Sequence, residues 1–200
     1  MQARDAPDVA PLLQTLYRFS AFDRTIDKLR DFVHYLKNYF KHTVTYSTIR
    51  FIIESYVVAT FFKFLLAFLI GGLSIAFNSK IEELPASAYQ DEPSATVIFV
   101  FLCIITPILE TIIFQWVPIK LLAKITPNIS LIIGIDALIF TAVHWFIYGF
   151  PMFIIVLPFG IILAWGFFMN SKDSLSKAFW VTFFIHMLGN LLAFYQIAST

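Results

Sequence analysis

Residues 96–118 read TVIFVFLCIITPILETIIFQWVP, an apolar run that carries a single carboxylate, Glu110. A helix needs about 20 apolar residues to cross a bilayer, so this run is long enough to span one. An ionisable side chain in hydrocarbon costs about 3 kcal/mol even by the milder scales, and such a group usually marks a function. The stretch therefore predicts a transmembrane helix that carries part of a polar reaction centre.

Four further apolar runs, at about 56–77, 130–149, 151–169 and 178–197, have similar lengths. The 200-residue chain is 59% hydrophobic and 18% aromatic, which exceeds the usual composition of a soluble domain. The runs lack the alternation of lipid-facing and lumen-facing residues found in barrel strands. We therefore predict an all-α, polytopic membrane protein with about five transmembrane helices.

The region before these runs has a different pattern. Between residues 9 and 42, apolar residues recur every three or four positions and basic residues fill much of the remainder. This predicts an N-terminal amphipathic helix at the membrane surface, and a partner or dimer helix is the alternative. We accordingly divide the chain into a cytoplasmic or interfacial region, 1–50, and a transmembrane domain, 51–200, whose motifs lie within 96–195.

The basic residues indicate the orientation. Of the 14 Lys and Arg, eight precede the first run, two follow the second and two lie between the fourth and fifth. The positive-inside rule then places the N-terminus in the cytoplasm and the C-terminus outside, in what we expect to be a bacterial cytoplasmic membrane. The net charge of +1 gives no reason to expect a nucleic-acid partner.

Three polar side chains fall at matching depths. Glu110 lies 17 residues before Pro127 and His144 lies 17 after it, so an antiparallel hairpin about that turn brings them level. Counted from Lys120 and Lys177, Glu110 is about 15 Å deep and His186 about 13 Å at 1.5 Å per residue. Three helices can therefore bring Glu110, His144 and His186 to one level.

Spacing along each helix gives the second indication. His186 and Asn190 are four residues apart and share a helix face, as do Phe140 and His144. Glu110 and Gln115 are five apart, about 140° around an ideal helix, so they reach one site only if the helix is distorted.

These residue types fit amide hydrolysis. A carboxylate paired with an imidazole can deprotonate water, while a second imidazole and an amide can stabilise the oxyanion of a tetrahedral intermediate. Two histidines and a glutamate could instead form a three-ligand zinc site, although the chain has no compact signature such as His-Glu-x-x-His.

In their order, Glu110, Phe140-x-x-x-His144 and His186-x-x-x-Asn190 resemble the motifs of the CPBP (Abi) family, which contains CAAX prenyl proteases and bacteriocin-processing enzymes. The resemblance covers about residues 96–195. It implies a glutamic intramembrane endopeptidase without a metal or other cofactor, acting on a membrane-embedded or lipid-attached peptide in the bilayer. It also implies that Glu110 activates water with help from His144, and that His186 and Asn190 hold the oxyanion.

The chain departs from the family pattern beside Glu110. The pattern has a second glutamate, an arginine and often a glycine, where this chain has Thr111, Gln115 and Trp116. Thr and Gln still form hydrogen bonds, so we expect Thr111 and Gln115, together with Phe140, to support the four catalytic residues.

Two other readings stay open. The chain could be a non-catalytic scaffold, immunity protein or regulatory partner on the same fold, or a proton-coupled transporter, which the absence of an evident repeat disfavours. Lys63 in the first run fits a structural ion pair or a water-lined groove as well as it fits catalysis. Asp136 is expected to act as a cap or to pair with Lys120 or Lys124.

Overall fold

The computed structural model describes Asp27, Arg30, Asp31 and residues 47–76 and 94–198. The chain divides into two units, Met1–Tyr46 and Ser47–Thr200. In the first unit Asp27, Arg30 and Asp31 are helical, and Arg30 Nη1 lies 3.2 Å from Asp27 Oδ1. The rest of the amphipathic helix predicted for 9–42 lies outside the described residues.

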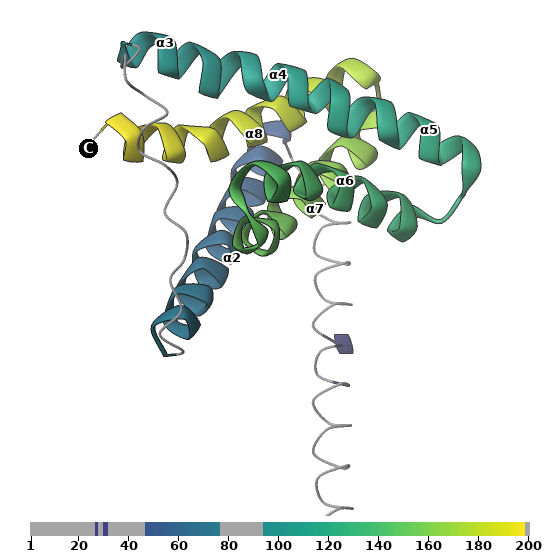
Figure 1. Ribbon diagram of the computed structural model, residues 1–200. Helices are drawn as coiled ribbons and strands as arrows, with labels where there is room; N and C mark the ends of the chain where they lie inside the picture. The colour runs from purple at the N-terminus through teal and green to yellow at the C-terminus, as the bar shows by residue number, and fades with distance from the viewer. Residues whose placement is uncertain (1–26, 28–29, 32–46, 77–93, 199–200) are drawn as a thin grey trace, which may run out of the picture. The chain divides into compact units, whose positions relative to one another are not determined.

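The described part of the second unit is helical and contains no strand. Its elements are α2 (Thr48–Ala76), α3 (Ala95–Phe99), η2 (Val100–Ile105), α4 (Thr106–Glu110), η3 (Thr111–Trp116), α5 (Val117–Ile125), α6 (Ile129–Tyr148), α7 (Phe150–Ser171) and α8 (Leu175–Ala198). Elements α3 to α5 form one continuous helical rod (Figure 1). Within these residues, five helices are long and apolar enough to cross a membrane, which confirms the predicted fold class.

The first span begins earlier than the sequence suggested. Helix α2 starts at Thr48 rather than near residue 56 and so includes Arg50 and Glu54. Arg50 Nε lies 2.6 Å from Glu54 Oε1, one helical turn away. A pair of this spacing stabilises a helix, so the helix extends through these two charged residues.

The rod that carries Glu110 passes through Pro107 and Pro118 without ending. Each proline lacks an N–H, and its ring would clash with the carbonyl four residues earlier in an α-helix. Those two carbonyls, of Cys103 and Phe114, lie in the π-helical turns η2 and η3. The wider π turn accommodates each proline, so the predicted helix distortion takes the form of two π turns on either side of Glu110.

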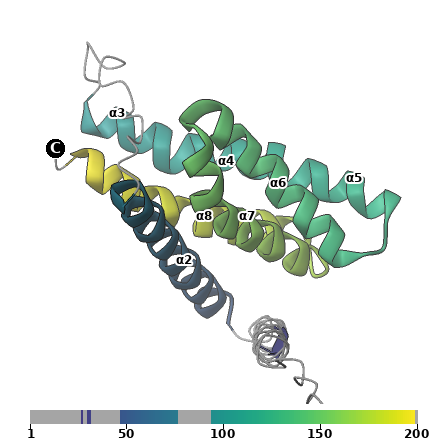
Figure 2. The same ribbon diagram turned by 60° about the horizontal axis from the view of Figure 1, so that its bottom comes forward.

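Helix α7 is the centre of the bundle, because it packs against α6, α8 and α2. The α3–α5 rod lies along α8, and α2 crosses α7 and α8 obliquely (Figures 1 and 2). Near the α5–α6 turn, apolar side chains of α5 to α8 form a core: Ile119, Ile132, Ile133, Ala164, Phe167 and Ala178. A separate cavity is lined by residues of α2, η2, α4, α6, α7 and α8.

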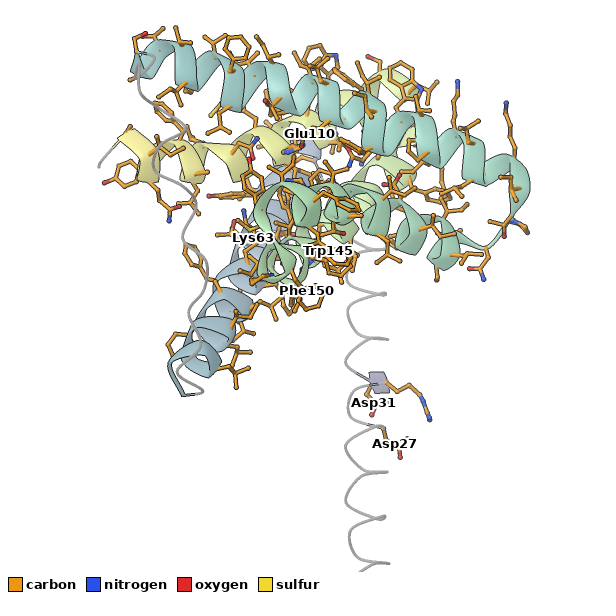
Figure 3. The ribbon with its side chains drawn as sticks, viewed as in Figure 1. Asp27, Asp31, Lys63, Glu110, Trp145 and Phe150 are labelled. Carbon is orange, nitrogen blue, oxygen red and sulfur yellow. The ribbon has the colours of Figure 1, made fainter. Side chains whose placement is uncertain are left out.

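The turn between α6 and α7 is rich in exposed aromatic rings. Gly149 makes the turn with a φ of 86°, a conformation that L side chains rarely adopt. Trp145 and Phe150 flank it and contact each other edge to face, with ring centroids 5.7 Å apart (Figure 3). Aromatic side chains concentrate where a membrane meets water, so this turn is suited to the interface.

Candidate active site

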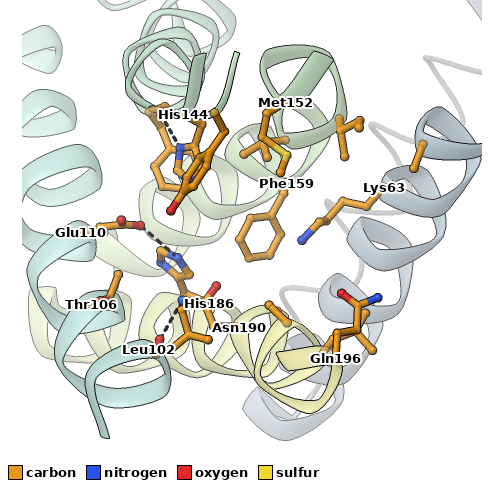
Figure 4. A pocket seen from close by; sticks show the side chains of 18 of the residues that line it. Lys63, Leu102, Thr106, Glu110, His144, Met152, Phe159, His186, Asn190 and Gln196 are labelled. Carbon is orange, nitrogen blue, oxygen red and sulfur yellow. Dashed lines mark hydrogen bonds and ion pairs between the residues drawn. The ribbon is translucent and has the colours of Figure 1, made fainter. Parts of the chain in front are cut away.

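The central contact of the site joins Glu110 to His186. Glu110 ends α4, His186 lies in the middle of α8, and Glu110 Oε2 is 3.2 Å from His186 Nε2 (Figure 4). The imidazole is 2% exposed and the carboxylate 22% exposed. A carboxylate oxygen only accepts hydrogen bonds when it is ionised, so Nε2–H is the donor. The contact holds the carboxylate at the edge of a cavity while the histidine stays buried behind it.

Two phenyl rings fix the orientation of His186. The rings of Phe140 and Phe159 meet the imidazole edge to face, with centroid distances of 5.7 and 5.5 Å. Gly189, one turn from His186, allows this packing, because a Cβ there would lie 2.6 Å from Phe159 Cζ. His186 is therefore held by the Glu110 carboxylate on one side and by aromatic rings on others.

His144 is oriented by its own helix. Its Nδ1 lies 3.0 Å from the carbonyl oxygen of Phe140, and the two rings pack with centroids 4.6 Å apart. Because a carbonyl can only accept, Nδ1 carries the proton. In the neutral tautomer that carries its proton on Nδ1, Nε2 is an acceptor, as a group that receives a proton requires.

Asn190 is held by a backbone carbonyl of the neighbouring rod. Its Nδ2 donates to Leu102 O at 2.9 Å. That carbonyl is available because the N–H of Thr106 bonds to Phe101 O in the π turn, and Pro107, the next residue, has no N–H. The π turn and the proline together thus create the acceptor that positions Asn190.

The structure brings the four predicted catalytic residues to one cavity of about 400 Å³, lined also by Phe140. Glu110, His144, His186 and Asn190 come from three helices, as the depth argument required. Thr111 and Gln115 do not line this cavity. Both are fully buried in η3, and their side-chain oxygen and nitrogen atoms have no hydrogen-bond partner among the described residues.

Asp136 does not pair with Lys120 or Lys124 as expected. Its carboxylate is fully buried on α6 and takes part in no ion pair within the described part of the chain, whereas both lysines are exposed. Asp136 lies one turn from Phe140, with its side chain toward the bundle interior. Asn128, not Asp136, caps α6, and the pairing fails because Asp136 is buried while the lysines are exposed.

Sequence reasoning left three contributors out of the site. Lys63 of α2 and Phe159 of α7 line the cavity, and the Leu102 carbonyl anchors Asn190. The position of Lys63 deep in an apolar run could have suggested that it belongs to the site. Phe159 is one of 24 phenylalanines, and a backbone carbonyl has no signature in a sequence.

The zinc alternative needs three ligands around one point. Among the described residues, no group of three or more His, Cys, Asp and Glu side chains is arranged to hold a metal ion. Glu110 and His186 already contact each other, and the Nδ1 of His144 faces a carbonyl. The donor set therefore fits acid–base chemistry better than it fits three-ligand coordination.

Comparison with known proteins gives a family match. The family model for type II CAAX prenyl endopeptidases, described as Rce1-like, matches residues 92–192, about half of the chain. The matched segment begins before α3 and ends within α8, so it contains Glu110, His144, His186 and Asn190, whereas Lys63 lies outside it. The searches of curated proteins and of solved structures returned no match.

Proposed function

We propose that this chain, which belongs to the Rce1-like family of type II CAAX prenyl endopeptidases, hydrolyses a peptide bond of a membrane-associated or lipid-attached protein with a water activated by Glu110. The observation that carries the proposal is the Glu110–His186 contact at a cavity inside a bundle of membrane-spanning helices. A carboxylate and imidazoles are costly in that setting, and hydrolysis uses both.

The reaction begins with Glu110 as the general base. Its carboxylate takes a proton from water, with the Nε2 lone pair of His144 as a second acceptor for the same water, and the hydroxide adds to the scissile carbonyl carbon. Protonation of Glu110 weakens its hold on His186 Nε2–H. That N–H, with the second N–H of Asn190, then stabilises the oxyanion.

The second step returns the proton. Protonated Glu110 donates to the nitrogen of the leaving amine as the carbon–nitrogen bond breaks, which yields a carboxylic acid and an amine and restores the enzyme. Water is the only co-reactant, and all groups that move protons belong to the chain.

The setting of the reaction follows from the helices and charges. The five candidate spans among the described residues make the chain an integral membrane protein. The distribution of Lys and Arg supports a cytoplasmic N-terminus. We expect the cut in the cytoplasmic half of the bilayer, in a bacterial cytoplasmic membrane. The N-terminal 50 residues would then lie at the inner surface, and 51–200 would carry the reaction.

The test compares membrane-peptide termini in cells that carry wild-type or Glu110→Gln protein at equal abundance. An uncleaved precursor that accumulates in the mutant supports proteolysis and identifies the substrate. Asp173→Asn is the matched control, because it makes the same change to an exposed carboxylate paired with Lys177 outside the cavity.

Identical termini in the two strains, with the cellular phenotype preserved, would contradict the proposal and favour a scaffold, immunity or regulatory protein. Loss of a proton-coupled flux without any cleavage defect would instead favour the transporter reading.

A further inference from the structure

A second set of polar side chains is buried outside the cavity. Gln115 of η3, Asp136 of α6 and Thr182 of α8 are fully buried, and none of them lines the cavity. Their polar side-chain atoms have no hydrogen-bond partner among the described residues. Buried polar groups in proteins are nearly always hydrogen-bonded, so these three residues need partners.

Two of these residues lie one helical turn from the site. Asp136 precedes Phe140 by four residues, and Thr182 precedes His186 by four. The rings of Phe140 and His186 contact each other, with centroids 5.7 Å apart. Residues four apart share a helix face, so the Asp136 and Thr182 side chains follow these two rings at an axial distance of about 6 Å.

The same helix faces meet again on the other side. Each of the three polar residues is four residues from a member of the apolar core near the α5–α6 turn, and these members are Ile119, Ile132 and Ala178. On the rod, Phe114 precedes Gln115 and contacts the Phe140 ring, with centroids 6.0 Å apart. Gln115, Asp136 and Thr182 therefore lie at one level between the site and the apolar core, and we call them the polar layer.

The polar layer contains one acid and, among the described residues, no cation. Asp136 takes part in no ion pair in this part of the chain. On α7, Leu163 lies four residues from Phe159 and four from Phe167, so this helix presents an apolar side chain at the same level. An ionised carboxylate without a counter-charge is so costly to bury that the group takes up a proton instead. Asp136 is therefore a neutral acid, and its O–H is a hydrogen-bond donor.

The imidazole of His186, one turn from the layer, needs such a donor. Its Nε2–H donates to Glu110 Oε2, so Nδ1 of the neutral ring carries a lone pair and accepts (Figure 4). Nδ1 is buried and has no partner among the described residues. The hydrogen bond made by one ring nitrogen determines whether the other carries the proton. A donor to Nδ1 would therefore keep the N–H on Nε2, where the oxyanion requires it.

We propose that Asp136 is a positioning residue, which supplies this donor through the polar layer and so keeps His186 in the Nε2–H tautomer. This inference rests on the proposed peptidase function. The acid O–H of Asp136 donates to Gln115 Oε1, and one N–H of Gln115 donates back to the carbonyl oxygen of the acid. The second N–H of Gln115 donates to the Thr182 hydroxyl, whose own O–H donates to His186 Nδ1. These bonds give a partner to every unpartnered atom of the polar layer and to Nδ1.

The first experiment changes Asp136 in two ways, with the substrate peptide identified by the Glu110→Gln comparison and the protein in phosphatidylcholine vesicles. Asp136→Leu has a similar size and no donor, so kcat should fall at least tenfold as part of the His186 population loses the N–H that faces the oxyanion. KM should stay the same, because Asp136 does not line the cavity. Asp136→Asn can still pair with the Gln115 amide and should keep kcat within about threefold of the wild type.

A second experiment measures the tautomer directly and needs no substrate. The ¹⁵N NMR signals of the histidine rings distinguish a proton on Nε2 from one on Nδ1, and His186→Gln identifies the signals of His186. The wild type and Asp136→Asn should show the Nε2–H form of His186. Asp136→Leu and Thr182→Val should show a mixture of the two forms.

Two threonines provide the test of the pathway and its control. Thr182→Val removes the hydroxyl that connects the layer to His186, so its loss of kcat should match that of Asp136→Leu, and the double variant should lose no more. Thr141→Val is the control, because Thr141 is equally buried, its hydroxyl donates to Ala137 O, and it does not line the cavity. It should change neither kcat nor the tautomer.

The outcomes separate the inference from the proposed function. Full kcat and an unchanged tautomer in Asp136→Leu would overturn the positioning role and leave the peptidase intact. A lower kcat with an unchanged tautomer, and no rescue by Asp136→Asn, would show a purely structural residue and also overturn it. If Asp136→Leu does not unfold cooperatively in detergent, Thr182→Val decides the question by the same two measurements. The expected tautomers in a protein that cleaves no peptide would contradict the proposed function alone.

Discussion

Asn190 of α8 donates a hydrogen bond to the carbonyl oxygen of Leu102, 88 residues earlier in the chain, at an Nδ2–O distance of 2.9 Å. The bond connects the last span to the span that carries Glu110, at the edge of the cavity. One side chain therefore connects two helices and, in the proposed reaction, supplies an N–H to the oxyanion.

Asn190→Asp tests both roles of this amide. The carboxylate keeps the size of the side chain but cannot donate to Leu102 O, so we expect turnover to fall about 100-fold or more, as when an oxyanion donor is removed. Thermal stability should also fall, by about 1 kcal/mol or more. Peptide cleavage and thermal unfolding measure the two effects.

Asn170→Asp is the control for this change. Asn170 donates a comparable bond to Gly166 O at 2.8 Å, is buried, and does not line the cavity. It should lose stability but keep its rate per folded molecule. Equal rates per folded molecule for Asn190→Asp and Asn170→Asp would contradict the proposed role of Asn190 as a donor to the oxyanion.

Pro107→Ala should raise stability while lowering activity. An N–H at position 107 can bond to a carbonyl one turn earlier, and a proline in a helix interior costs about 3 kcal/mol relative to alanine. The restored α turn would compete for Leu102 O and rotate Glu110 away from His186. We expect at least a tenfold loss of kcat together with a higher unfolding temperature.

Pro151→Ala provides the comparison, because Pro151 occupies the first turn of α7, where proline interrupts no hydrogen bond. It should leave kcat unchanged. Full activity in Pro107→Ala would show that the π turn does not position Glu110.

Gly189→Ala should impair the site through Phe159. The added Cβ would lie 2.6 Å from Phe159 Cζ and force the ring to move. Since that ring contacts both His186 and Lys63, we expect kcat/KM to fall at least tenfold in the peptide assay. Gly134→Ala meets nothing within 4 Å and should be neutral or stabilising by up to about 1 kcal/mol. Similar behaviour of the two variants would contradict the packing argument.

Metal chelation should leave the activity intact. The described residues contain no group of three His, Cys, Asp or Glu side chains that could hold a metal, and the proposed steps use none. The measurement is peptide cleavage before and after dialysis against a strong chelator, with metal content determined on the same sample. If chelation abolishes the activity and added zinc restores it, the result would support the three-ligand zinc site.

The sequence predicted the fold class because long apolar runs leave few other structures possible in a membrane. It misplaced the start of the first span, since hydropathy counts Arg50 and Glu54 as two charges and the helix holds them as a pair. The pairing of Asp136 with exposed lysines was also wrong, because sequence distance does not show which way a side chain points on a packed helix.

The site was predictable to the level of its residue types and depths. Glu110, His144, His186 and Asn190 do line one cavity. The specific contacts could not be predicted from the sequence. The Glu110–His186 distance depends on how α8 packs on the rod, and the hydrogen bond from Asn190 ends on a backbone atom. The catalytic roles of these residues remain predictions for the experiments above.

The π turn η2 (Val100–Ile105) makes the number of residues there more important than their identity. Phe101 in this turn is 58% exposed and can be exchanged for another apolar residue at little cost. Deletion of one residue between 100 and 105 would instead close the π turn to an α turn, and the Leu102 carbonyl that positions Asn190 would then be taken up by a backbone N–H. We therefore expect this stretch to accept many substitutions and no change of length, a constraint that only insertion and deletion scanning reveals.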